Sequence, residues 1–175
     1  CMTGIPLFPI LKKDFVSHGI LPGRYYDFIG INYYTRGAVR FFKEDVFPGK
    51  NYNDLGWEIY PEGIVKFAKE LYKTYCAPIY ITENGTCDRQ DSFRSRFIYD
   101  HLKLLCESGL PVERYYYWTF IDNFEWAEGE TAPFGLVELD WETQKRTVRK
   151  SGEFFTSIIE NSGVTGEMYE KYMRQ

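Results

Sequence analysis

Histidine and cysteine are scarce in this chain, and their scarcity limits the chemistry that it can perform. The two histidines and four cysteines are His18, His101, Cys1, Cys76, Cys87 and Cys106. No two cysteines have the C-x-x-C spacing of a zinc site, so neither a metal nor another cofactor is expected. Four unpaired thiols are typical of a reducing compartment, and we therefore expect a cytoplasmic protein.

The sequence also lacks a long apolar run and a basic cluster. No stretch of about 18 apolar residues is present to cross a bilayer. The formal net charge is −4, which does not favour nucleic acid or an anionic membrane surface as a partner. The first residues contain no basic start followed by an apolar run, so no signal peptide is expected. Because residue 1 is not Met, we expect the natural N-terminus to lie upstream.

Aromatic residues, by contrast, are abundant. They make up 19% of the chain, with 15 Tyr, 14 Phe and 4 Trp, and hydrophobic residues as a whole make up 44%. A length of 175 residues with this composition suffices for one domain with a sizeable core. The aromatic side chains could fill that core, cover an interface or line a sugar site, where flat rings stack on the C–H faces of pyranose rings. Composition leaves all three open.

One stretch, at residues 77–85, combines a buried strand with a carboxylate. Residues 77–82 are β-branched, aromatic and apolar, which predicts a strand, and Glu83-Asn84-Gly85 follows as a turn signal. In α/β proteins the carboxyl ends of the strands are where active sites are built. Glu83 could there be a nucleophile, a general base or a metal ligand. The alternative is a solvated loop glutamate.

The other segments alternate between strand and helix patterns. Irregular structure is expected at 1–24, and a possible lid or rim at 37–58. Strands are expected at 26–32, 77–82 and 114–120, and a hairpin at 134–140 and 146–149. Helices are expected from Pro61 onward, between the cap Asp91-Ser92 and Gly109, and over 150–161, with a charged tail after them. This order is typical of βα units on a parallel sheet.

Each expected helix has an apolar stripe for the core. The residues expected to face inward are Ile64, Ala68, Leu71 and Tyr75 in the first helix, Phe93, Phe97, Leu102 and Leu105 in the second, and Phe154, Phe155, Ile158 and Ile159 in the third.

Polar and aromatic residues follow all three expected parallel strands. The clusters are Asn32 with Tyr34, then Glu83, then Glu125 with Trp126. Because the carboxyl ends of parallel strands meet at one edge of a sheet, these side chains are expected to converge. The sequence therefore predicts a single site built from three strand ends.

Several motifs together resemble glycoside hydrolase family 1, the β-glucosidase and β-galactosidase family. The motif at 80–85, Y-I-T-E-N-G, is similar to the nucleophile motif of that family. Further similar stretches occur in the family's order at 27–34 (D-F-I-G-I-N-Y-Y), 57–63 (W-E-I-Y-P-E-G), 118–129 (W-T-F-I-D-N-F-E-W-A-E-G), 134–137 (F-G-L-V) and 140–149. The resemblance covers roughly residues 20–160.

The resemblance implies a retaining mechanism on a (β/α)8 barrel and a role for each cluster. Glu83 would be the catalytic nucleophile, Tyr34 would hydrogen-bond it, and Asn32 would lie nearby. The residues that would contact the sugar are Glu125 through two hydroxyls, Trp126, Trp118 as a platform and Phe134 near its far end. For Trp118 and Phe134 simple core packing is the alternative.

The sequence departs from the family in one respect that governs the rest. A retaining glycosidase needs two carboxylates about 5 Å apart, and the family's acid/base Glu lies in a T-x-N-E-P motif upstream of the nucleophile. No N-E-P occurs here. A complete (β/α)8 barrel typically takes about 250 residues. We therefore expect residues 1–175 to be a single partial domain, the last three βα units of the barrel, with strands 6–8.

Two functions remain open on this evidence. In the first, the chain hydrolyses β-linked mono- or oligosaccharide glycosides when the missing N-terminal part of the barrel completes it. In the second, it is a catalytically inactive fragment or pseudo-enzyme that binds sugar or a partner chain. Either the missing barrel half or a second copy of the chain is expected as the partner, because an open parallel sheet leaves its edges uncovered.

Overall fold

The computed structural model describes residues 23–45 and 47–174. Most of the loop expected at 1–24 lies outside this range, and so do Cys1 and His18. The elements in chain order are β1 (Ile29–Asn32), β2 (Ala38–Arg40), β3 (Lys43–Asp45), α1 (Glu62–Tyr75), β4 (Ile79–Asn84), α2 (Arg94–Glu107), β5 (Val112–Tyr117), a 3-10 turn (Trp126–Glu128), β6 (Val137–Leu139), β7 (Arg146–Val148), α3 (Lys150–Asn161) and α4 (Gly166–Met173).

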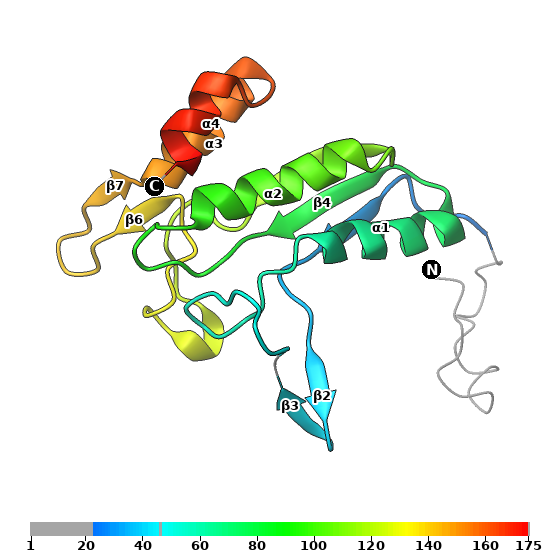
Figure 1. Ribbon diagram of the computed structural model, residues 1–175, viewed down its shortest axis with the longest axis horizontal. Coiled ribbons are helices and arrows are strands. Elements are labelled where there is room, and N and C mark those ends of the chain that lie inside the picture. Colours follow the sequence, from blue (N-terminus) through cyan, green and yellow to red (C-terminus); the bar gives the residue numbers. More distant parts are fainter. Residues whose placement is uncertain (1–22, 46, 175) are drawn as a thin grey trace.

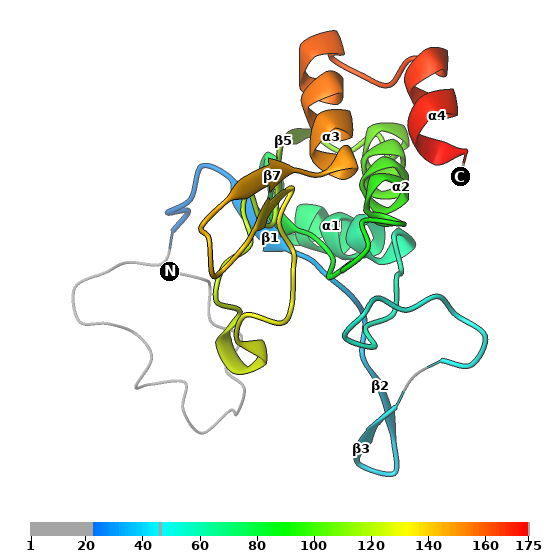
Figure 2. The ribbon, with the colours of Figure 1, turned by 90° about the vertical axis from the view of Figure 1, so that its left-hand side faces the viewer.

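A three-stranded parallel sheet with the order β1-β4-β5 is the centre of the fold; β4 is labelled in Figure 1, and β1 and β5 in Figure 2. Helices α1 and α2 lie together on one face of it (Figure 2). The core between them contains Ile31, Ile64, Ala68, Ile79, Ile81 and Leu105. The alternation of strand and helix on a parallel sheet is thereby confirmed.

No helix of the described residues lies on the opposite face of the sheet, which we call the open face. Phe28 and Tyr80 stack on it with ring centroids 4.2 Å apart. The Arg114 guanidinium carbon lies 5.5 Å from the centroid of the Tyr80 ring, and Tyr116 on the same strand is half exposed. Exposed aromatic side chains that gather on one face of a sheet are typical of a contact surface.

A second core joins the C-terminal helices to α2. It contains Ile98, Leu136, Phe154, Met168 and Tyr172, all nearly inaccessible to solvent. Helix α3 has the predicted bounds, but Ile159, expected to face inward, is 65% exposed. The outward position of Ile159 follows from the packing of α2 and α4 on the side of α3 that carries Phe154.

The last dozen residues, expected to be a charged tail, in fact contain helix α4, which stands beside α3 (Figure 2). The Thr165 side chain caps it by accepting a hydrogen bond from the Met168 amide at 3.2 Å. Met168 and Tyr172, four residues apart, are its buried positions. This spacing of i and i+4 is a helical signal that the surrounding charges obscure.

The cap of α2 is a second correction. The Asp88 carboxylate accepts hydrogen bonds from the amides of Phe93 and Arg94 at 2.8 and 2.9 Å. Asp91, expected to be the cap, instead accepts hydrogen bonds from the amide and the hydroxyl of Ser151 at 2.9 and 2.6 Å. The carboxylate of Asp91 therefore ties α2 to α3 rather than capping its own helix.

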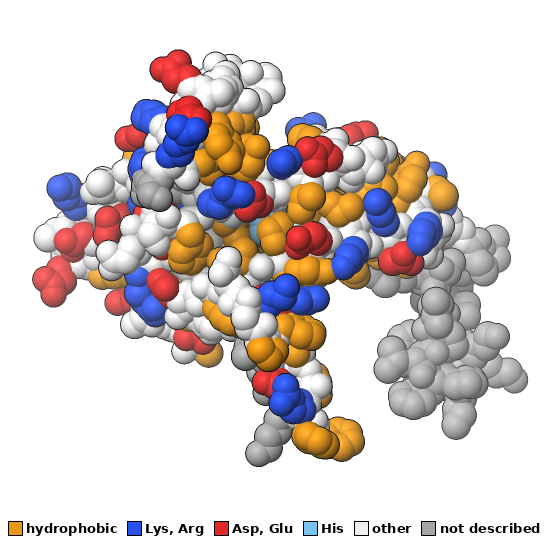
Figure 3. Space-filling model, in the orientation of Figure 1, with side chains coloured by type: hydrophobic (Ala, Val, Ile, Leu, Met, Phe, Trp, Pro, Cys, Tyr) orange, Lys and Arg blue, Asp and Glu red, His pale blue; other side chains and the backbone are white. Residues whose placement is uncertain are grey.

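Smaller differences concern the ends of strands. Strand β1 begins at Ile29, three residues later than expected, and β5 runs over Val112–Tyr117 rather than 114–120. The hairpin expected near the C-terminal end forms as β6 and β7. Within the mixed segment at 37–58, β2 and β3 form a hairpin that projects from the body, with Phe41 and Phe42 exposed at its tip (Figures 1 and 3).

Candidate active site

Glu83 and Tyr34 meet at the carboxyl ends of β4 and β1. The Tyr34 hydroxyl donates a hydrogen bond to Glu83 Oε2 at 2.6 Å. The backbones of the same two segments are joined by the Tyr33 amide, which donates to the Glu83 carbonyl oxygen at 2.9 Å. Glu83 is half-buried, so its carboxylate is partly desolvated while one oxygen is held by Tyr34.

Burial and the neighbouring carboxylate change the acidity of the tyrosine. Desolvation is the largest cause that raises the pKa of the Tyr34 hydroxyl far above its ordinary value, followed by its hydrogen bond to Glu83. The hydroxyl therefore keeps its proton across the pH range in which proteins are stable. It acts as a fixed donor to the carboxylate.

Asn32 lies next to this pair and uses its side chain differently. Its Cα pairs with that of Glu83 in the sheet register, and its side chain is exposed. The Thr82 hydroxyl donates to Asn32 Oδ1 at 2.6 Å. Within the described residues, the Asn32 side-chain amide nitrogen has no hydrogen-bond partner and is available to a ligand.

Trp118 follows β5 and contacts both the end of β4 and Glu125. Its backbone amide donates to the Asn84 carbonyl oxygen at 2.9 Å, and its indole nitrogen donates to Glu125 Oε2 at 3.4 Å. A Cβ on Gly85 would collide with the Trp118 carbonyl oxygen, so only glycine permits this approach. The structure therefore brings Trp118 and Glu125 together, and ties Trp118 to the end of β4.

Phe134 and Trp126, the other predicted sugar contacts, have opposite environments. Phe134 is 1% exposed, and its ring packs against Tyr34 and Trp57, with centroids 6.3 and 5.8 Å apart. Trp126 begins the 3-10 turn and is 85% exposed. Phe134 thus packs against the ring of Tyr34. The sugar contacts of Phe134 and Trp126 stay predictions.

Trp57 is a neighbour of the site for which the sequence motif suggested no role. Its ring lies edge-on to Tyr34 with centroids 6.1 Å apart. The loop that carries it is held by Asn53, whose side-chain oxygen accepts hydrogen bonds from the amides of Leu55 and Trp57 at 3.0 and 2.9 Å. Its place within the W-E-I-Y-P-E-G motif was the signal that could have identified it.

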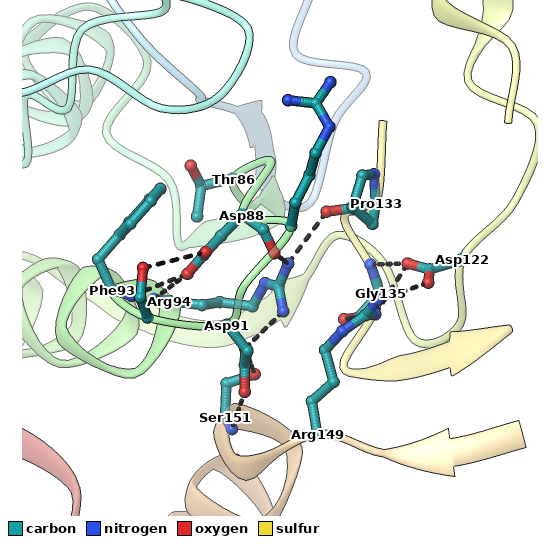
Figure 4. A network of polar contacts seen from close by, with 12 residues as sticks. Thr86, Asp88, Asp91, Phe93, Arg94, Asp122, Pro133, Gly135, Arg149 and Ser151 are labelled. Carbon is teal, nitrogen blue, oxygen red and sulfur yellow. Dashed lines mark hydrogen bonds and ion pairs between the residues drawn. The ribbon is translucent and has the colours of Figure 1, made fainter. Parts of the chain in front are cut away.

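A buried polar network holds the loops behind the site (Figure 4). Arg149 donates to both carboxylate oxygens of Asp122 at 3.0 and 2.8 Å, and Asp122 Oδ1 also accepts from the Gly135 amide at 2.8 Å. Arg94, fully buried, donates to the carbonyl oxygens of Asp88 and Pro133 at 2.7 and 3.0 Å. These contacts anchor both ends of the segment that carries Glu125 and Trp126.

The described residues offer no other obvious chemistry. Within 23–45 and 47–174, no three His, Cys, Asp or Glu side chains gather as metal ligands would. In the same part of the chain, no helix has the length and apolar character needed to span a bilayer.

A shallow hollow lies beside the buried network. The residues that line it are Arg89, Gln90, Asp91, Ser92, Glu138, Arg149 and Lys150.

This chain is similar to known glycosidases in both sequence and fold. The β-galactosidase of Pyrococcus woesei is 37% identical over 93% of this chain, and β-glucosidase A of Thermotoga maritima is 35% identical over 79%. The solved β-glycosidase from Pyrococcus horikoshii superposes with a TM-score of 0.79 at 36% identity, over 89% of this chain. The alternating parallel βα units thus match part of the barrel of that enzyme class.

The chain covers only part of these proteins. It spans 37% and 35% of the length of the two relatives and 39% of the solved structure. The sequence pattern of Glycosyl hydrolase family 1 matches residues 18–164, which is most of the chain. On this match and on the identities above, the chain belongs to glycosyl hydrolase family 1.

Proposed function

We propose that this chain supplies the nucleophile half of a retaining β-glycosidase active site, with Glu83 as the nucleophile. The observation that carries the proposal is the hydrogen bond of 2.6 Å from Tyr34 to the Glu83 carboxylate at the carboxyl ends of parallel strands. This position suits a carboxylate that attacks a substrate lying over the end of the sheet. The substrates would be β-linked mono- or oligosaccharide glycosides.

In the proposed reaction Glu83 attacks the anomeric carbon, and the bond to the leaving-group oxygen breaks as the glycosyl-enzyme bond forms. The leaving oxygen takes a proton from a second carboxylic acid, which the missing part of the barrel would supply. Water then attacks the anomeric carbon, gives its proton to the same carboxylate and releases Glu83. Glu125, Trp118 and Trp126 would bind the sugar during both steps.

We further propose that the three strands described here are strands 6–8 of the barrel, and that the missing N-terminal part covers the open face. The exposed rings of Phe28 and Tyr116 support this, and so does the share of the relatives that the chain leaves unmatched. The second candidate is an inactive fragment that binds sugar or a partner chain. It is favoured by the absence of an N-E-P motif from all 175 residues.

An experiment on the chain in a completed barrel separates the two candidates. The completed barrel is this chain co-expressed with the part of the Pyrococcus woesei β-galactosidase that it does not match. An activated 2-fluoro glycoside should label it, and peptide mapping should find the added sugar mass on Glu83. The chain alone should not turn over natural β-glucosides, because general-acid catalysis contributes about 10²- to 10⁴-fold.

The labelled site decides the outcome. Label on Glu125 or Glu128 would refute the proposed nucleophile. A completed barrel that hydrolyses β-glucosides without trapping any label would refute the covalent mechanism, and an assembled but inactive barrel would favour the inactive fragment. The Glu83→Gln variant is the control, because it removes the nucleophilic charge while it keeps the shape of the side chain.

A further inference from the structure

Strand β4 carries extra residues at its carboxyl end against both of its neighbours. The pairs that flank the irregularity are Ile31–Ile81 and Asn32–Glu83 towards β1, and Ile81–Tyr115 and Asn84–Tyr117 towards β5. On each side β4 uses one residue more than its partner, which is a β-bulge. Bulges bend a strand and change the direction of the side chains that follow. The bulged residues here are Thr82 and Glu83.

The bulge changes which face of the sheet these side chains occupy. Before it, Ile79 and Ile81 are fully buried under the helices, and alternation along a regular strand would put residue 83 on that same buried face. Instead Glu83 is partly exposed and bound to Tyr34, whereas Asn84 is fully buried. The bulge therefore brings the Glu83 carboxylate out of the core and takes Asn84 into it.

Asn84 is connected to both neighbouring strands at this point. Its side-chain Nδ2 donates to the Tyr33 carbonyl oxygen at 2.7 Å, and its Oδ1 accepts from the Tyr115 hydroxyl at 2.7 Å. Its backbone oxygen accepts from the Trp118 amide at 2.9 Å. Because a buried amide that loses such a partner is left desolvated and unpaired, these contacts resist any shift of the bulge.

The contacts of Asn84 lead directly to those of the Glu83 carboxylate. Two hydrogen bonds join the backbone of Tyr33 to β4. The Tyr33 amide donates to the Glu83 carbonyl oxygen, and the Tyr33 carbonyl oxygen accepts from Asn84 Nδ2. Tyr34, the next residue, then donates to the Glu83 carboxylate at 2.6 Å. The relative position of the tyrosine and the carboxylate is thus set by the segment that Asn84 holds.

We propose that Asn84 is a positioning residue for Glu83. Its amide, supported by the Tyr115 hydroxyl, holds the bulge in the register that directs the carboxylate towards the substrate and keeps Tyr34 against it. The inference rests on the proposed function only in taking Glu83 as the nucleophile. Trp118 is held by the same residue, so nucleophile and sugar platform keep a fixed spacing.

The test compares Asn84→Ala and Tyr115→Phe with wild type in the completed barrel. For Asn84→Ala, the rate of glycosyl-enzyme formation should fall by about 100-fold, the effect of a misplacement of about 1 Å. For Tyr115→Phe it should fall by about 10-fold, the loss of one hydrogen bond. KM should change much less than kcat in both variants. The double variant should resemble Asn84→Ala, because the two residues act together.

A matched control removes a hydroxyl elsewhere on the sheet. Tyr26→Phe loses a hydrogen bond of 2.9 Å to the Tyr75 carbonyl oxygen, near the amino end of β1 and away from Glu83. It should lower the melting temperature about as Tyr115→Phe does and leave kcat unchanged. If both Asn84→Ala and Tyr115→Phe lowered the melting temperature while kcat stayed at the wild-type value, the positioning role would be wrong.

A crystallographic distance gives a readout that does not need activity. In Asn84→Ala, the Glu83 carboxylate should lie beyond hydrogen-bonding distance of the Tyr34 hydroxyl. A contact of 2.6 Å retained in the variant would overturn the inference, whatever the kinetics. If wild-type completed barrel proved inactive, the proposed function would fail, and this distance alone would still decide whether Asn84 positions Glu83.

Discussion

The Tyr34 hydroxyl and the Glu83 carboxylate, which are 49 residues apart in the chain, lie 2.6 Å apart in the structure. The hydroxyl is a donor that keeps its proton, because burial and the carboxylate both raise the pKa of Tyr34. A donor aimed at one carboxylate oxygen leaves the other free to attack. The pair is therefore arranged as the proposed function requires, with Tyr34 orienting the proposed nucleophile Glu83.

Replacing Tyr34 with Phe tests that arrangement. Hydrogen bonds to charged groups contribute about 1.5–3 kcal/mol, so Tyr34→Phe should slow glycosyl-enzyme formation in the completed barrel by roughly 10- to 100-fold. Pre-steady-state labelling with an activated 2-fluoro glycoside measures this step. A variant that labels Glu83 at the wild-type rate would show that the hydroxyl does not assist the nucleophile.

The Glu125 carboxylate provides a second test, on substrate binding. If the Glu125 carboxylate accepts hydrogen bonds from two sugar hydroxyls, Glu125→Gln should lower kcat/KM by about 10- to 100-fold, because such contacts strengthen towards the transition state. Glu128→Gln, an exposed change three residues away in the same loop, is the control and should have little effect. Wild-type kinetics of Glu125→Gln on every β-glycoside tested would remove Glu125 from the site.

The open face of the sheet predicts how the isolated chain behaves in solution. Self-association should follow from the exposed aromatic rings of Phe28 and Tyr116 on the open face. The outer strands β1 and β5 should add to it, because neither pairs with a further strand among the described residues. Sedimentation velocity should show dimers or larger species, which co-expression with the missing part converts into a one-to-one complex. A sharp, monodisperse monomer that unfolds cooperatively on heating would contradict this prediction.

The buried Asp122–Arg149 ion pair should be far more sensitive to a single substitution than an exposed ion pair of the same chain. Both side chains are buried, so Asp122→Ala leaves a guanidinium without its partner and should cost about 3–5 kcal/mol of unfolding free energy. Asp100→Ala breaks the exposed pair with Arg96 on α2 and should cost about 0.5 kcal/mol or less. Urea titrations of the two variants measure the contrast. Equal losses would show that burial does not decide the cost.

His101 should make stability depend on pH. It is buried, its Nδ1 donates to the Phe97 carbonyl oxygen at 2.8 Å, and burial lowers its pKa from 6.5 to about 4. Between these values the unfolded chain binds more protons than the folded one, so stability rises with pH through this window and is complete above it. Acidification towards pH 4 should remove roughly 2–3 kcal/mol from this source.

A non-titrating variant isolates that contribution. Urea titrations of wild type and His101→Gln at pH 7 and at pH 4.5 should show a smaller pH-dependent loss in the variant, because glutamine cannot take up the proton. The carboxylates of the chain affect both proteins alike and cancel in the comparison. An identical loss in both proteins would mean that His101 does not titrate in this window.

Much of the fold could be predicted from the sequence. The bounds of α3, the hairpin of β6 and β7, and the parallel arrangement of the βα units follow from periodicity, turn residues and strand composition. The family also follows from motifs that are contiguous in the chain. The cytoplasmic location and the roles of the individual sugar contacts stay predictions.

What local patterns missed depends on partners far away in the chain. Asp91 looks like a helix cap, but the Ser151 amide and hydroxyl, 60 residues away, occupy its carboxylate, and Asp88 caps α2 instead. Ile159 has the spacing of a core residue, but the neighbouring helices pack on the other side of α3. Both misassignments come from choices between partners that a local window does not contain.

The candidate site divides in the same way. The sequence by itself determined that a glutamate ends a strand and that other polar clusters end neighbouring strands, because strand formation and turns depend on nearby residues. Only the tertiary structure decided the face that Glu83 occupies, since its direction depends on a bulge whose register is set across β1 and β5. Strand alternation alone would have directed that carboxylate into the core, where Asn84 lies instead.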